Sequence, residues 1–169
     1  MSFKKVMCVA LATVLVGAFA ASASASDKKM SINLGHVAIE TTPIGRGTEY
    51  FAQIVNEKTN GRITVSVFPN SQLGGNREMI EQLQMGTLQL CSPSNAFLGG
   101  FTDKTALFDL PYLFTSEEGA FKVFDSEVGT AILDDLEGAG IKGLGWFAMG
   151  WRNVTCNKEV HTPADMAGL

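Results

Sequence analysis

The sequence predicts an α/β fold, in which a largely parallel sheet is flanked by helices within a single domain. Segments whose apolar residues alternate, as in strands, take turns with segments whose apolar residues recur at helical spacing. Most of the helical segments begin after a capping residue and end at a glycine. Strands that alternate with helices favour a parallel sheet, because each helix returns the chain to the edge where the previous strand began.

Residues 1–25 are predicted to be a cleaved signal peptide, which leaves residues 26–169 as the folded domain. Lys4 and Lys5 precede an apolar run, and an Ala-Ser-Ala triplet that suits a signal peptidase follows it. The apolar run is shorter than the roughly 20 residues of a membrane span. We therefore expect a periplasmic protein whose mature chain begins near Ser26. The alternative is an N-terminal anchor that is not cleaved.

The net charge argues against a nucleic-acid partner. The predicted leader holds two of the 13 basic residues and none of the 17 acidic residues, so the remaining chain carries a formal charge of −6. Such a surface repels the phosphate backbone. An anionic ligand would therefore have to be met by local basic groups.

The first predicted β-α-β unit covers the chain from residue 30 to residue 69. Residues 30–37 alternate apolar and polar side chains, which is typical of a strand. Thr42 is expected to cap a helix that begins at Pro43 and stops near Gly61. The stretch RITVSVFP then predicts a second strand, because its apolar side chains alternate up to the proline.

A second unit repeats this pattern. Asn76 is expected to cap a helix that ends at Gly86, and residues 87–92 are expected to form a third strand. The loop before this helix, LGGN, offers backbone N–H groups that could meet an anion. Without a lysine or a phosphate-binding motif, a turn followed by a helix cap is the better interpretation.

The chain after Pro93 is less regular. Residues 107–114 (LFDLPYLF) are so apolar that we expect a buried irregular segment. Ser116 and Ser126 are expected to cap two short helices. The second helix should bury four apolar side chains before it stops at the glycines of positions 138–140. These four are Val128, Ile132, Leu133 and Leu136.

The last part of the chain predicts strands and then a helix start. Residues 141–155 are expected to form two strands joined at Gly150. Thr162, Pro163 and Asp165 then have the spacing of a helix cap. Since hardly any residues follow this cap, we expect the natural protein to continue beyond Leu169.

The motifs of common enzyme classes are missing from the sequence, which contains no H-E-x-x-H, Cys-x-x-Cys or G-x-S-x-G pattern. We therefore expect no catalytic residue, no metal and no cofactor. Cys91 could in principle pair with His36 as a thiolate, but packing is the usual role of a thiol on an apolar strand. Cys91 and Cys156 are expected to be buried thiols, although their spacing does not exclude a disulfide.

Arg152 stands in an apolar and aromatic run, GWFAMGWRNVT. Low polarity strengthens a bidentate contact between a guanidinium and a carboxylate. Two interpretations remain open from the residues themselves. Arg152 either forms a structural ion pair with an acidic side chain or binds the carboxylate of a ligand.

Several long stretches of the chain resemble one protein family. The most specific are TNGRITVSVFPNSQLGGNREMIEQLQMGT, DLPYLF, and the ending GWRNVT with TPADMAGL. These stretches resemble the solute receptors of tripartite ATP-independent periplasmic (TRAP) transporters, of the dicarboxylate-receptor type. The resemblance covers nearly all of residues 26–169. It implies a periplasmic-binding-protein-like fold, with this chain as the first of two lobes around a cleft.

The resemblance also implies functional residues. It gives Arg152 the role of contacting the substrate carboxylate, while the family's second carboxylate-binding arginine would follow the end of this chain. The loop after the first strand, at His36 and Val37, is a second expected cleft region. The loop after the third strand is a third, where Ser94, Asn95 and Phe97 are candidates for hydrogen bonds and an aromatic wall. This loop lacks the charged pair of sialic acid receptors, which counts against that ligand.

The resemblance therefore implies a receptor without catalytic activity. It would bind a small organic acid, either a C4-dicarboxylate or a sugar acid, and deliver it to the membrane permease of a TRAP transporter. Two alternatives stay open. The receptor could serve a sensor kinase or another type of transporter, or the protein could be a periplasmic enzyme that acts on carboxylic acids.

Overall fold

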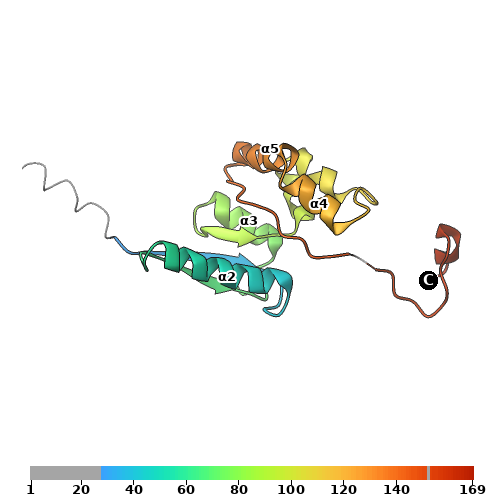
Figure 1. The fold of residues 1–169 in the computed structure, drawn as a ribbon, viewed down its shortest axis with the longest axis horizontal. Coiled ribbons are helices and arrows are strands. Elements are labelled where there is room, and N and C mark those ends of the chain that lie inside the picture. The colour runs from blue at the N-terminus through green and yellow to red at the C-terminus, as the bar shows by residue number, and fades with distance from the viewer. Residues whose placement is uncertain (1–27, 152) are drawn as a thin grey trace, which may run out of the picture.

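The computed structural model describes residues 28–151 and 153–169, so the predicted signal peptide and Arg152 lie outside the described residues (Figure 1). The regular elements, in chain order, are β1 (Met30–His36), α2 (Pro43–Lys58), β2 (Ile63–Phe68), α3 (Asn76–Gln84), β3 (Leu90–Ser92), α4 (Glu117–Phe124) and α5 (Glu127–Asp135). Short 3-10 helices complete the chain: η2 (Asn95–Gly100), η3 (Asp103–Asp109), η4 (Leu136–Ala139) and η5 (Pro163–Met166). No helix among the described residues is long and apolar enough to cross a membrane.

The three described strands form one parallel sheet in the order β2-β1-β3. Strand β1 is central: its Leu34 lies opposite Val67 of β2 on one side and Leu90 of β3 on the other. Each connection between successive strands contains a helix, as a parallel sheet requires. The prediction of an α/β fold with a largely parallel sheet is confirmed.

Helices α2 and α3 lie on opposite faces of this sheet. His36 of β1 meets Thr48 of α2, where His36 Nε2 and Thr48 Oγ1 are 3.2 Å apart. The preceding residue, Gly35, faces α3, because a Cβ atom at Gly35 would lie only 2.7 Å from Met79 Sδ. Successive residues of a strand point to opposite faces, so the two contacts assign one helix to each face.

The boundaries of α2 confirm the prediction for the first unit. The Thr42 hydroxyl accepts a hydrogen bond from the backbone N–H of Gly45 at 3.2 Å, and Pro43 is the first helical residue. The helix ends at Lys58, and Gly61 follows with a φ of +73°, which glycine adopts without a steric penalty. The turn into β2 therefore comes where the glycine indicates it.

The prediction that Asn76 caps α3 is wrong. The capping residue is Gly75, whose N–H donates to the Glu78 carboxylate at 2.7 Å, and Asn76 is the first residue of the helix. The amide oxygen of Asn76 accepts instead from the backbone N–H of Ser94, at 3.0 Å. A contact between residues 18 positions apart in sequence leaves no local pattern, which is why the sequence did not reveal it.

Strand β3 is shorter than predicted, since it pairs with β1 only over Leu90–Ser92. Residues 87–89 lie outside the sheet because they still belong to the turn that follows α3. The backbone N–H groups of Thr87 and Leu88 both donate to the carbonyl oxygen of Gln82 in that helix.

Helices α4 and α5 begin at the predicted caps. Ser116 accepts from the N–H of Gly119 at 3.1 Å, and Ser126 accepts from the N–H of Val128 at 3.2 Å. Ile132 and Leu136 are buried and Leu133 is partly buried, but 49% of Val128 is exposed. The predicted burial of Val128 is therefore wrong, because this first-turn residue borders an open hollow between α5 and η3.

The segment 107–114 is not buried as a whole, which corrects that prediction. Only Phe108 and Phe114 turn inward, where they meet the rings of Phe124 and Trp146. Tyr112 is 97% exposed, and three leucines of the segment are also exposed. These are Leu107, Leu110 and Leu113. Leu107 lies in η3 next to the inward-facing Phe108, whereas Leu110 and Leu113 follow this helix.

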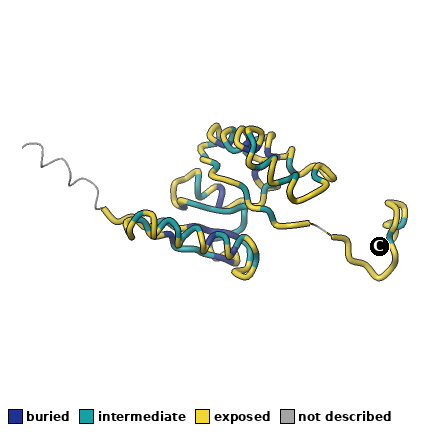
Figure 2. The backbone as a smooth tube through the Cα atoms, viewed as in Figure 1, coloured by how far each residue is buried: buried dark blue, intermediate teal, exposed yellow. Residues whose placement is uncertain are grey.

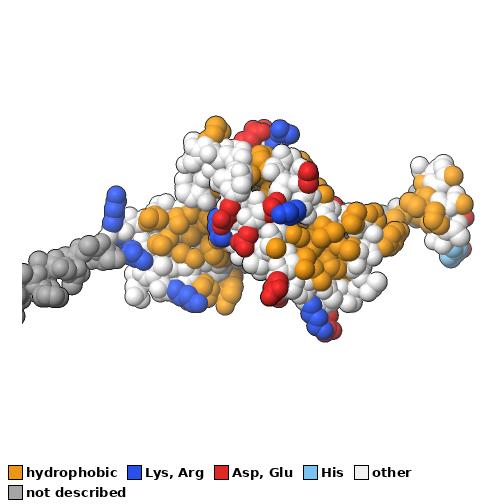
Figure 3. All heavy atoms as spheres, turned by 90° about the horizontal axis from the view of Figure 1, so that it is seen from above, with side chains coloured by type: hydrophobic (Ala, Val, Ile, Leu, Met, Phe, Trp, Pro, Cys, Tyr) orange, Lys and Arg blue, Asp and Glu red, His pale blue; other side chains and the backbone are white. Residues whose placement is uncertain are grey.

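Hydrophobic side chains accordingly gather on the surface of this region. Figure 3 shows a broad hydrophobic area on the side of the molecule that carries α4 and α5. An apolar hollow of about 590 Å³ lies between η3 and α5, with Leu107, Leu110, Val128 and Ile132 in its lining.

The two strands predicted for residues 141–155 are absent from the described part of that segment. The chain there is extended without a sheet partner, and its side chains hold it in place. The Trp146 ring stacks on Phe124, and its indole N–H donates to the Gly129 carbonyl at 3.2 Å. The next side chain, Phe147, lies against α2, because a Cβ atom at Gly47 would lie 2.6 Å from Phe147 Cε1. Side-chain packing in two directions takes the place of the strand pairing that we expected for this segment.

The buried residues concentrate where the sheet meets its helices and under α5 (Figure 2). Ile80, Leu98 and Leu136 form the centre of one cluster, against which Cys91 packs. Figure 1 shows the last residues, including η5, lying apart from this body.

Both described cysteines are free thiols. Cys91 is partly buried, and desolvation raises the pKa of its thiol to about 12. Cys156 is exposed, so the predicted burial of this second thiol is wrong. Cys91 is paired in register with Gly35 and therefore faces α3, whereas His36 faces α2. A thiolate pair between Cys91 and His36 is thus not formed.

Candidate functional site at the carboxyl edge of the sheet

The carboxyl ends of β1, β2 and β3 lie along the same edge of the sheet, where ligands bind in open α/β sheets. The loops after β1 and β2 are joined there by backbone hydrogen bonds. Ser71 N–H donates to the carbonyl oxygen of His36 at 3.1 Å, and Asn70 N–H donates to that of Ala38 at 3.0 Å. These hydrogen bonds hold the backbones of the two loops against each other along this edge.

The register of the sheet brings two predicted groups of site residues together. His36 lies directly opposite Ser92, the last residue of β3. The candidates His36 and Val37 at the end of β1 therefore adjoin the loop that carries Ser94, Asn95 and Phe97. This neighbourhood arises because β3 pairs with β1, although β2 lies between them in sequence.

His36 is buried at this edge, with only 1% of the residue exposed. The Thr48 hydroxyl lies 3.0 Å from the carbonyl oxygen of Ile44 and 2.9 Å from that of Gly45, and it donates to these groups. Its oxygen is then free to accept a hydrogen bond from His36 Nε2, which favours the tautomer protonated at Nε2. The side chain of His36 therefore points into the α2 face of the sheet.

The environment of His36 favours its neutral form. Its Nδ1 atom is buried and has no hydrogen-bond partner among the described residues. Desolvation lowers the pKa of His36, while the backbone of Ala38 and, less strongly, the charge of Glu49 oppose this shift. Val37 follows as a partly exposed residue at the edge.

The loop after β3 sends its candidate side chains in different directions. Ser94 is exposed, and 47% of Phe97 is exposed. The Asn95 amide instead donates to the carbonyl oxygen of Thr105 at 2.8 Å, and its Oδ1 atom is buried without a partner in the described chain. Ser94 and Phe97 can therefore meet a ligand from this loop, whereas Asn95 is turned toward the protein.

Two arginines lie near this edge in the first turns of helices. Arg46 belongs to α2 and is exposed. Arg77 belongs to α3 and forms an ion pair with Glu81, with 3.0 Å between Nε and Oε1. Arg152 lies outside the described residues, so its predicted contact with a ligand carboxylate stays a prediction. Trp151, just before it, is 54% exposed.

Sequence reasoning missed two residues of this edge. Thr48 orients His36, and Asn76 holds the backbone of Ser94. Thr48 lies 12 residues from its partner in sequence and Asn76 lies 18 from its own. The only available signal was that both are small polar residues within amphipathic helices, which is too common to single them out.

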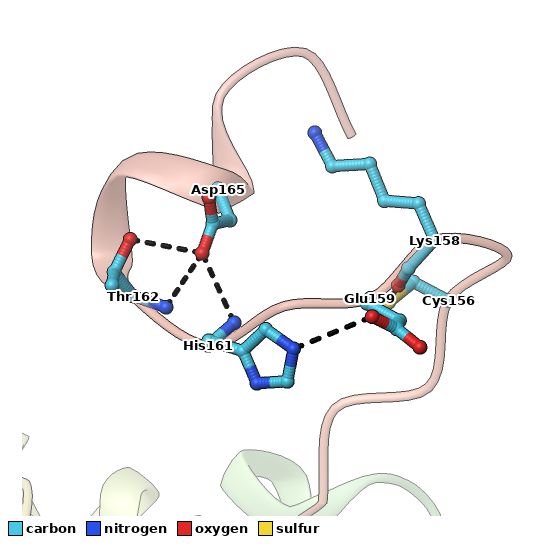
Figure 4. A network of polar contacts seen from close by, with 6 residues as sticks. All are labelled: Cys156, Lys158, Glu159, His161, Thr162 and Asp165. Carbon is cyan, nitrogen blue, oxygen red and sulfur yellow. Dashed lines mark hydrogen bonds and ion pairs between the residues drawn. The ribbon is translucent and has the colours of Figure 1, made fainter.

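The described residues include no cluster of three histidine, cysteine or acidic side chains that could hold a metal ion. The polar network near the end of the chain is a helix cap, as predicted (Figure 4). The carboxylate of Asp165 accepts hydrogen bonds from the backbone N–H groups of Thr162 and His161 and from the Thr162 hydroxyl. The two backbone contacts lower the pKa of Asp165.

Comparison with known proteins gives one consistent result. Residues 34–169 match the bacterial extracellular solute-binding proteins of family 7. The C4-dicarboxylate-binding periplasmic protein DctP of Rhodobacter capsulatus is 38% identical over 161 residues, which are 92% of this chain and 48% of that protein. The chain spans about half or less of the length of the relatives it matches.

Solved structures agree with this match. A TRAP periplasmic solute-binding protein from Sulfurospirillum deleyianum with bound succinate is 37% identical, with a TM-score of 0.62 over 67% of this chain and 36% of that chain. Another from Ochrobactrum anthropi, whose C-terminus is bound in its ligand-binding pocket, is 33% identical. Its TM-score is 0.80 over 84% of this chain and 45% of that chain.

Proposed function

Because the chain belongs to family 7 of the bacterial extracellular solute-binding proteins, we propose that its protein is a periplasmic receptor for a small organic acid. Residues 26–169 form one of two lobes around a cleft, and a membrane permease of the TRAP type accepts the ligand. The observation that carries this proposal is the match of residues 34–169, together with the 37% identical structure that holds succinate. The protein releases its ligand unchanged and catalyses no reaction.

The carboxyl edge of the sheet supplies suitable chemistry for one side of the cleft. The exposed Ser94 provides a hydroxyl group, and Phe97 provides an aromatic surface. His36 is held neutral, so it keeps the edge free of a buried charge when the ligand is absent. Arg152 neutralises a carboxylate of the ligand, and a C4-dicarboxylate is the proposed ligand class.

Calorimetric titration of the full-length protein tests the ligand class. We expect succinate or L-malate to bind with a dissociation constant in the micromolar range or below, and mass spectrometry should recover the acid unchanged. Galactonate, a sugar acid, serves as the contrasting ligand. If none of these acids binds, or if the acid is converted, the receptor proposal fails.

Substitution of Arg152 tests its role in the same protein. Removing one side of a charge-assisted pair costs about 2 to 5 kcal/mol of binding, which is a factor of tens to thousands in affinity. Arg152→Lys should recover part of the loss, because lysine keeps the charge but not the planar fork. The melting temperature of the ligand-free receptor should not fall. A structural arginine would behave in the opposite way, with a large loss of stability in Arg152→Ala.

Location and transport partner need separate measurements. The N-terminal sequence of the protein from a periplasmic extract should begin near Ser26, and a retained Met1 would contradict cleavage. The loaded receptor should co-purify with an integral membrane permease. Co-purification with a sensor kinase would support the alternative receptor role.

A further inference from the structure

Two side-chain hydrogen bonds join the loop after β3 to other parts of the fold. Asn76 Oδ1 accepts from the backbone N–H of Ser94 at 3.0 Å. One residue further, Asn95 donates to the carbonyl oxygen of Thr105, a residue that is fully buried. We propose that Asn76 is a positioning residue, which holds Ser94 at the ligand-binding edge without touching the ligand. This inference rests on the proposed receptor function.

Asn76 has no other task in its own helix. Gly75 is the capping residue of α3, and the Glu78 carboxylate accepts its N–H, so Asn76 does not serve as the cap. An asparagine at the first helical position is therefore free to use its amide oxygen elsewhere. The structure shows that it uses this oxygen for the loop after β3.

The loop offers few other places where it can be held. Pro93 has no N–H group, so Ser94 carries the only backbone donor between the last residue of β3 and the start of η2. Without the Asn76 oxygen, the N–H of Ser94 loses its protein partner. The loop then keeps the contact of Asn95 with Thr105 and the bond that the Ser94 carbonyl oxygen accepts from the Phe97 N–H.

The position of Ser94 matters because of its neighbours. It lies two residues beyond Ser92, which faces His36 in the register of the sheet. Its side chain is exposed, whereas that of Asn95 is turned inward. A hydroxyl group helps to bind an acid only if its direction is fixed before the ligand arrives, since ordering it during binding costs entropy. The hydrogen bond that Asn76 accepts from the Ser94 N–H fixes the backbone that carries this hydroxyl.

The test uses the full-length protein and succinate, with Asn76→Ala as the main variant. We expect its affinity to fall about 3- to 10-fold, the effect of one ordinary hydrogen bond. The control is Gln53→Ala, which removes an exposed side-chain hydrogen bond to Glu57 within α2 and changes no charge. This control should bind as the parent does.

A double-mutant cycle separates positioning from a general loss of structure. Ser94→Ala should weaken binding in the parent but add little in the Asn76→Ala background, because the hydroxyl is then no longer held in place. Amide hydrogen exchange of Ser94 gives a second measurement that does not depend on the ligand. It should become faster in Asn76→Ala and remain slow in Asn76→Asp, which keeps the acceptor oxygen.

The outcomes are distinct. If the parent binds no organic acid, the receptor proposal and this inference both fail. If the parent binds and Asn76→Ala binds equally well, the positioning role alone is overturned. Should Asn76→Ala fail to fold, Asn76→Ser replaces it, since serine suits the start of a helix but its shorter side chain does not reach Ser94. Unchanged affinity and unchanged exchange in that variant would equally overturn the inference.

Discussion

Residues 28–92 and residues 93–151 are held together by different interactions. The first region contains the whole described sheet, whose strands are joined by regular backbone hydrogen bonds. The second region contains no strand and depends on ring contacts among Phe108, Phe114, Phe124 and Trp146. The first region therefore spreads its stability over many similar bonds, whereas the second concentrates it in a few side chains.

The two regions also differ in how much apolar surface they leave open. In the second region, the hollow between η3 and α5 is lined mainly by apolar side chains. In the first region, Met79 and Ile80 of α3 are fully buried. Local caps and apolar spacing indicate the elements of the first region, and parallel strand pairing then joins distant residues such as Leu34 and Leu90. The second region has no strand pairing, so its distant contacts are made by individual side chains.

The largest effect should come from Trp146→Ala, which would break the second region. The indole ring contacts Phe108 and Phe124, and its N–H donates to the Gly129 carbonyl. We expect urea unfolding to show a loss of about 3 to 5 kcal/mol. Trp151→Ala is the control, because 54% of Trp151 is exposed and its change should cost far less. Equal losses in the two variants would show that the aromatic cluster does not hold the region.

A somewhat smaller effect is expected from Met79→Ala in the first region. Met79 is fully buried and fills the space next to Gly35, so its truncation leaves a cavity between α3 and β1. The expected loss is about 2 to 5 kcal/mol by urea unfolding. The matched control is Met85→Ala, since Met85 is 69% exposed. A loss larger than that of Trp146→Ala would reverse the ranking of the two regions.

The buried His36 should make the first region sensitive to acid. Burial lowers its pKa below the ordinary value of 6.5, so the unfolded chain takes up a proton at a higher pH than the folded chain does. The contribution to stability is complete above about pH 6.5 and is lost as the pH falls toward the folded-state pKa.

Thermal unfolding from pH 8 to pH 5 measures this effect. The slope due to one proton is at most about 1.4 kcal/mol per pH unit. His36→Gln should remove this part of the slope, whereas His161→Gln changes an exposed side chain and should preserve it. A slope that survives in His36→Gln would assign the acid sensitivity to another group.

The smallest effects are expected at the helix caps, where the two regions should behave alike. Thr42→Ala in the first region and Ser126→Ala in the second each remove one hydroxyl that accepts a backbone N–H. Each change should cost about 1 kcal/mol in urea unfolding. Thr42→Ser and Ser126→Thr keep the acceptor and should restore most of the stability. A cap that costs several kcal/mol in only one region would mean that it also supports tertiary packing.

The resemblance implied the candidate site residues, and the β-α-β units explain why several of them meet, since such units place the ends of their strands at one edge. His36 ends a strand that the sequence indicated, Val37 and Ser94 follow such strands, and the structure brings them to neighbouring positions. The inward turn of Asn95 could not be predicted. It depends on the carbonyl oxygen of Thr105, which η3 brings within reach.

The sequence by itself determined the elements whose signals are local. Thr42, Ser116 and Ser126 cap the helices they precede, because a cap joins atoms only two or three residues apart. Only the tertiary structure decided which residues of the apolar segments are buried. It also decided that Asn76 contacts the loop after β3. Residues 107–114 and Trp146 show this, since their exposure depends on surfaces contributed by other segments. Contacts between distant residues are selected by the geometry of the whole fold, and a local pattern contains no record of that geometry.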